Sequence, residues 1–182
     1  MNILASPLPE TVAVGEASVR LKTGYRTGIQ VARVADSDLS DLIKAGAILR
    51  LYFGDDVPSD KVDALEAVMR FHRRGTEPPK RTAPRVLDWD HDAGRIPADF
   101  RREYDIDLAD PATRLHWWVF MAYLDNLSNG AEIKQAMYYR GPQPRDLTKA
   151  ERPRWNKLQK AYALPPRTLD DAIARDAALW GD

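Results

Sequence analysis

Residues 88–94, DWDHDAG, contain the side chains that come closest to a metal site by type and spacing. Asp88, Asp90 and Asp92 alternate as the first three ligands of a calcium-binding loop do. The rest of that pattern is displaced, because the required glycine comes one residue late and Asp99 stands where a longer glutamate closes the site. We therefore expect a polar loop whose carboxylates support the following helix, with no metal site.

Patterns for other chemistry are absent from the sequence. The three histidines, His72, His91 and His116, form no local zinc motif, and the chain has no cysteine to complete one. No serine lies in a GxSxG turn, and no glycine-rich nucleotide loop occurs. We expect no catalytic residues and no cofactor, and a metal-dependent enzyme using His91 is the weakest alternative.

The segment 104–124, YDIDLADPATRLHWWVFMAYL, concentrates aromatic side chains that could stack on a ligand. Surfaces that stack nucleic-acid bases interleave aromatic with basic residues, whereas Arg114 is the only basic residue between 103 and 133. The segment predicts a helix that is apolar on almost every face, which is typical of a central, buried helix. We expect Asp110 to cap this helix, the helix to run to about Leu127, and its aromatic residues to form the core.

The elements that must position these residues can be read from apolar periodicity. Residues 11–22 alternate around Gly15-Glu16, which predicts a β-hairpin. Helices are expected over about 24–35, 36–54, 59–75, 96–104 and 129–140. The β-branched residues of 24–35 also suit a strand. Asn129 with Glu132 is expected to cap the last of these.

The second of these helices is expected to begin near Asp36 or Ser37, either of which can cap it. Its buried face is predicted to contain four apolar residues with helical spacing. They are Leu39, Leu42, Ile43 and Ala47.

The last part of the chain differs in character after the break at GPQPRD. Residues 145–164 are basic and 168–182 are acidic, and Pro165-Pro166 separate them. Both segments have an amphipathic pattern, so we expect two helices of opposite charge that pair within one chain or between neighbouring chains. The stiff proline joint favours pairing between chains. The candidate partner-binding residues are Trp155, Leu158, Tyr162, Leu169, Ile173, Ala177 and Trp180.

The fold class expected is mainly α with a small N-terminal β-hairpin. We expect a compact helical domain over residues 1–144 and a C-terminal helical appendage over 145–182, which serves as an arm for oligomerisation or client binding. The 27 basic and 27 acidic residues balance, which gives no reason to expect a nucleic-acid partner. No signal peptide or apolar run of membrane-spanning length is present, so an intracellular protein without a membrane partner is expected.

The order of three segments resembles a known phage family. They are LDWDHDAGRIPADFRREYDIDL, LHWWVFMAYLDNL and EIKQAMYYRG, and they resemble the family of long-tailed phages and prophages named for gene product fifteen. Asp105 stands where glycine is usual in the family, and Val119 where a basic residue is usual. The resemblance covers about residues 8–140, and 145–182 lie outside it. The residues that match the family motif are Asp88, Trp89, Asp92, Ile96, Phe100, Tyr104, Ile106, Asp107, Leu108, His116, Trp117, Trp118 and Phe120.

The resemblance implies a tail assembly chaperone in the host cytoplasm. Such a protein binds and solubilises the tape measure protein, helps to recruit tail tube subunits and acts as a homo-oligomer. The family has no catalytic residues to transfer to this sequence. The alternative from another class is a structural virion protein, either a head–tail adaptor or a minor tail component.

Overall fold

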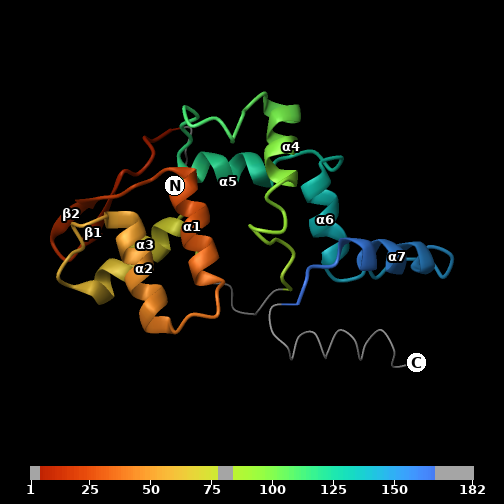
Figure 1. The fold of residues 1–182 in the computed structure, drawn as a ribbon, viewed down its shortest axis with the longest axis horizontal. Helices are drawn as coiled ribbons and strands as arrows, with labels where there is room; N and C mark the ends of the chain where they lie inside the picture. The colour runs from red at the N-terminus through yellow and green to blue at the C-terminus, as the bar shows by residue number, and fades with distance from the viewer. Residues whose placement is uncertain (1–4, 78–83, 167–182) are drawn as a thin grey trace. The chain divides into compact units, whose positions relative to one another are not determined.

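The computed structural model of the protein describes residues 5–77 and 84–166. Within these ranges, a two-stranded antiparallel sheet is followed by seven helices (Figure 1), which confirms the predicted fold class. The strands are β1 (Thr11–Val14) and β2 (Ala17–Arg20). The helices are α1 (Tyr25–Ala35), α2 (Asp41–Phe53), α3 (Lys61–His72), α4 (Arg95–Tyr104), α5 (Trp117–Asp125), α6 (Glu132–Arg140) and α7 (Arg152–Tyr162).

The described chain divides into two compact units, which we call unit 1 and unit 2. Unit 1 contains residues 5–77 and 100–127, and unit 2 contains residues 84–99 and 128–166. The boundary between residues 99 and 100 falls inside α4. The separation of a tail at residue 145 stays a prediction.

The hairpin forms where the alternation predicted it. Gly15 has a φ of +57° in the two-residue turn, a left-handed conformation that glycine adopts without steric cost. Val14, which pairs with Ala17, is buried, and β1 packs on α3. The helix supplies the apolar surface that so small a sheet needs.

Helix α2 begins later than predicted, and it buries a different face. Ser40 is its N-cap residue, not Asp36 or Ser37. Leu39, Leu42 and Ile43 of the predicted face are 45%, 84% and 55% exposed, so that prediction is wrong. The buried residues are Ile48, Leu49, Tyr52 and Phe53. The C-terminal half of α2 has the longer apolar run, so α2 packs against α1 and α3 through this half.

Helix α5 also starts later than predicted, at Trp117 rather than after Asp110. The preceding backbone pairs with the entry to α1: Tyr25 N–H donates to Leu115 O (2.9 Å), and Trp117 N–H donates to Thr23 O (2.7 Å). Residues 115 and 116 therefore stay extended. The side chain of His116 caps the helix by accepting from Trp118 N–H at 3.1 Å.

The aromatic side chains of α5 form the core of unit 1, as predicted. Phe120 is fully buried, and its ring stacks on those of Tyr25, Phe100 and Trp117 at centroid distances of 5.3, 5.1 and 5.8 Å. The indole N–H of Trp118 donates to Phe71 O at 2.9 Å, so its polar atom is satisfied inside the core. The aromatic segment is thus a packing element, which leaves other surfaces for binding.

Trp117 is held between Gly28 of α1 and His72 at the end of α3. Its indole N–H donates to His72 O at 2.8 Å, and the imidazole stacks on the indole at 4.9 Å. On the α1 side the fit is tight, since a Cβ built on Gly28 would lie 2.2 Å from the Trp117 ring. The missing side chain at residue 28 is what allows the indole to lie there.

We expect Gly28→Ala to lower the free energy of unfolding by about 1–3 kcal/mol, because the added methyl group must displace a buried indole. Gly46→Ala is the matched control in α2, where a Cβ would meet nothing within 4 Å. There the substitution should raise stability by about 0.5–1 kcal/mol. Urea denaturation of both variants measures the difference, and equal effects would contradict this packing.

The environment of His72 makes unit 1 sensitive to acid. Burial lowers the pKa of His72 from 6.5 to about 4, and the charge of Arg73 acts in the same direction. Tyr52 O–H lies 2.7 Å from His72 Nδ1, so the neutral imidazole can accept its hydrogen bond. Because the unfolded chain takes up this proton near pH 6.5 and the folded chain only near pH 4, stability is full above pH 6.5 and declines as the pH falls towards 4.

We expect the free energy of unfolding to decrease by about 3 kcal/mol through His72 when the pH is lowered across this window. His72→Asn retains an acceptor for Tyr52 but cannot titrate, so the variant should lose less stability between pH 7 and pH 4.5. His91→Asn, at an exposed position, should behave as the wild type. Identical pH profiles for wild type and His72→Asn would show that His72 is not responsible.

Candidate functional site

The Asp88–Asp92 loop uses its first carboxylate to shape its own backbone. Asp88 Oδ1 accepts from the backbone N–H groups of Asp90 (2.9 Å) and His91 (2.7 Å). The same carboxylate forms an ion pair with Arg85. A carboxylate with these partners stabilises a turn.

Asp92 is paired with Arg140, the last residue of α6. The two guanidinium N–H groups of Arg140 reach the two carboxylate oxygens of Asp92 at 2.6 and 2.9 Å. Both side chains are almost fully buried, with exposed fractions of 0% for Asp92 and 2% for Arg140. Arg95 adds a second guanidinium at 2.9 Å, and Asp88 N–H donates to the same carboxylate at 3.0 Å. This is a planar, bidentate pair with its remaining lone pairs satisfied.

Arg140 also connects three parts of unit 2 through carbonyl groups. It donates to Val86 O at 3.0 Å and to Tyr162 O at 2.7 Å. One side chain therefore joins the segment before α4, the end of α6 and the end of α7. The quoted motif EIKQAMYYRG contains this arginine, but local sequence gives no sign of its partner, because Asp92 lies 48 positions away.

Asp99, which the sequence places only at the closing position of the displaced calcium-loop pattern, is a second buried carboxylate. It is 0% exposed and accepts from the backbone N–H groups of Glu132 (3.2 Å) and Ile133 (2.8 Å) at the start of α6. It thus caps α6 from α4. The predicted cap by Asn129 with Glu132 is wrong, since Ala131 is the N-cap residue and offers no side-chain acceptor.

The Tyr104–Leu108 turn of the motif contributes to unit 1. Tyr104 O–H donates to Tyr123 O at 2.9 Å, and Leu108 O accepts from Tyr25 O–H at 2.8 Å. Asp105 has a φ of +55°, a left-handed conformation that glycine adopts at no steric cost, which fits the glycine that the resemblance implies at this position. Asp107 caps the following turn by accepting from Ala109 N–H at 2.8 Å.

The remaining motif residues also lie in or near the packed parts of their units. Ile96 and Phe100 are buried, whereas Trp89 and Ile106 are half-buried. His116 Nε2 lies 3.0 Å from Pro9 O, which fits a neutral imidazole that donates there and accepts at Nδ1. Burial also lowers the pKa of His116.

The structure describes three of the seven candidate partner-binding residues. Trp155 is 4% exposed and packs against the rings of Tyr138 and Tyr139 at 5.0 and 5.1 Å. Leu158 and Tyr162 are half-buried. Leu169, Ile173, Ala177 and Trp180 lie outside the described residues, and partner binding by all seven stays a prediction.

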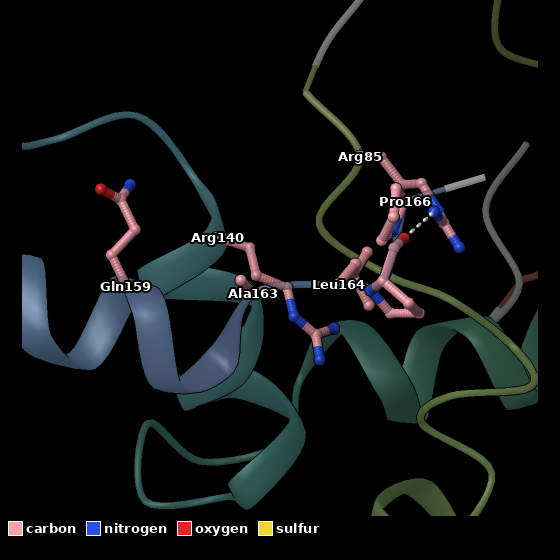
Figure 2. A pocket seen from close by; sticks show the side chains of 7 residues that line it. Arg85, Arg140, Gln159, Ala163, Leu164 and Pro166 are labelled. Atoms are coloured by element: carbon pink, nitrogen blue, oxygen red, sulfur yellow. Dashed lines mark hydrogen bonds between the residues drawn. The ribbon is translucent and has the colours of Figure 1, made fainter. Parts of the chain in front are cut away.

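A pocket of about 370 Å³ lies beside the Arg140 network (Figure 2). Its wall includes residues 163–166 and the side chain of Gln159, and Arg85 donates to Pro165 O at 3.4 Å. The pocket is lined by two guanidinium groups, those of Arg85 and Arg140. Both form ion pairs with carboxylates of the Asp88–Asp92 loop. The pocket therefore adjoins a structural network.

In residues 5–77 and 84–166, no three His, Asp or Glu side chains converge in a way that would hold a metal ion. None of the helices in the same ranges has both the length and the hydropathy of a membrane span.

Comparison with known families identifies the class as structural and assembly proteins of bacteriophages, rather than enzymes. The chain belongs to the bacteriophage Gp15 protein family, whose model matches residues 4–164. The predicted resemblance is confirmed, but it extends past residue 140 and includes α7, contrary to expectation. No curated protein and no solved structure matches the chain.

We expect Arg140→Met to lower the free energy of unfolding by about 3–5 kcal/mol, because it leaves Asp92 buried without its main partner. Arg101→Met is the matched control, since its ion pair with Asp105 is exposed and should contribute about 0–1 kcal/mol. Chemical denaturation compares the two variants. A cost for Arg140→Met no larger than for the control would refute the structural role of the pair.

Proposed function

We propose that this chain is a phage tail assembly chaperone that binds the tape measure protein and keeps it in solution. Membership of the bacteriophage Gp15 family over residues 4–164 is the observation that carries the proposal. The charged motif residues Asp88 and Asp92 serve the fold, which supports a role in binding rather than catalysis. Recruitment of tail tube subunits in the host cytoplasm belongs to the same proposal.

A chaperone for a long apolar helical client needs apolar surface that remains exposed after folding. The described residues include five large apolar or aromatic side chains that are exposed. They are Leu39, Leu42, Ile43, Val62 and Tyr138. Many weak contacts of this kind, repeated over several copies, suit a client that tail tube subunits must later displace.

The C-terminal segment is proposed to add to this surface. Its apolar stripe is expected to contact a partner, while the basic residues of 145–164 attract acidic groups. Trp155 is buried against α6, so this proposal assigns it the support of α7. Leu158 and Tyr162 of α7, with the residues beyond Pro166, supply the contact in this proposal.

Co-expression with the tape measure protein of the same phage tests the proposal. We expect the full chain to move the tape measure protein into the supernatant and to copurify with it. The double variant Leu169→Ser and Ile173→Ser should decrease the recovered complex by about tenfold, since it removes two apolar contacts. Ala178→Ser, on the opposite side of the same predicted helix, should have no effect.

Failure of the full chain to bind or solubilise the tape measure protein would reject the proposed function. Equal recovery with the double variant would reject only the role of the C-terminal segment. Mass spectrometry of purified virions distinguishes a chaperone from a structural virion protein, the remaining alternative. Retention of the chain in finished particles at fixed copy number would favour a head–tail adaptor or minor tail component.

A further inference from the structure

An apolar cluster at the start of α2 remains uncovered in unit 1. We define the α2 cluster as Leu39, Leu42 and Ile43, whose side chains are 45%, 84% and 55% exposed. The interior of unit 1 makes no use of it, because α2 packs through its C-terminal half. Large aliphatic residues that are exposed to water and close together in sequence are unfavourable for the free chain, so such a cluster indicates a contact surface.

The rim of the α2 cluster is acidic. Asp36, Asp38 and Asp41 flank the three aliphatic residues in sequence, and all three are exposed. The surface thus combines an apolar centre with negative charge at its edge. A partner for it needs an apolar hollow with basic residues beside it.

Unit 2 contains a groove with those properties. We define the α6–α7 groove by its volume of about 860 Å³ and its lining. Met137, Tyr138 and Val86 supply apolar surface, while Lys134 and Arg154 supply positive charge. The Tyr138 ring packs on buried Trp155 at 5.0 Å, which fixes one wall. The groove is large enough for several aliphatic side chains.

We propose that the α2 cluster of one copy docks into the α6–α7 groove of a second copy. The charges select this pairing, because two acidic clusters repel each other and so do two basic grooves, whereas cluster and groove attract. The aliphatic side chains enter the groove, and Asp38 and Asp41 lie towards Lys134 and Arg154.

The contact joins two different surfaces of the chain. Two copies that exchange both contacts close as a dimer, whereas copies that each give the cluster to one neighbour and the groove to another form a ring or an open filament. The inference rests on surfaces of the described chain and does not require the tape measure protein. In the assembled form the α2 cluster and Tyr138 join copies, so contact with the client in the proposed function is left to Val62 and the C-terminal segment, which the co-expression experiment tests separately.

Light scattering of the purified full chain over a concentration series tests the contact. We expect the mass to rise with concentration, and Leu42→Ser to weaken self-association by about tenfold or more. Val62→Ser is the matched control, because Val62 is 81% exposed in the same unit but lies outside the cluster. It should associate as the wild type. Circular dichroism melting verifies that both variants are folded.

A charge exchange tests the pairing itself. Asp41→Lys and Arg154→Glu should each associate weakly alone, because each places like charges across the contact. Mixed in equal amounts, they should associate again, since every junction then has opposite charges. A contact between two identical surfaces would not be restored in this mixture.

Three results would overturn the inference. They are a wild-type chain that stays monomeric throughout the series, a Leu42→Ser variant that associates as strongly as the wild type, and a mixture of the charge variants that stays weak. If Ile173→Ser abolishes self-association while Leu42→Ser does not, the C-terminal segment is the contact and the α2 cluster is not.

Discussion

The candidate site depends on the buried ion pair between Asp92 and Arg140. Removing two charges from water costs several kcal/mol for each ion, and only good geometry with further hydrogen bonds offsets this. Here the carboxylate has bidentate contact with Arg140, a second guanidinium and a backbone N–H, while Arg140 also reaches two carbonyl groups. A displaced loop or helix would leave a buried charge unpaired, so the pair specifies one arrangement of unit 2.

This constraint shows what many of the charged and aromatic residues of the family motif do in the fold. Asp88 shapes a turn, Asp92 and Asp99 fix the two ends of α6, and the indoles of α5 pack in the core of unit 1. The groups that could do chemistry serve the fold. In our proposals, binding is assigned to the exposed cluster on α2 and to the groove between α6 and α7.

Periodicity predicted the hairpin, the helices and the aromatic core, because these depend on local pattern and on the strong burial of rings such as Phe120. It failed where distant residues decide the outcome. The start of α5 is set by backbone pairing with residues 23–25, and the cap of α6 comes from Asp99 on another helix. The predicted buried face of α2 was wrong, because an amphipathic stripe does not show which half of a helix packs against a neighbour. The pairing of Asp92 with Arg140 has no local signature at all.

A double-mutant cycle between Asp92→Asn and Arg140→Met, measured by urea denaturation, is the most direct test of the central claim that the motif carboxylates hold the fold. If the two groups act as one buried pair, the cost of the double variant should fall short of the summed single costs by about 2–3 kcal/mol. Costs that simply add would show that Asp92 and Arg140 act independently. The carboxylates of the Asp88–Asp92 loop would then have to be explained by binding rather than by structure.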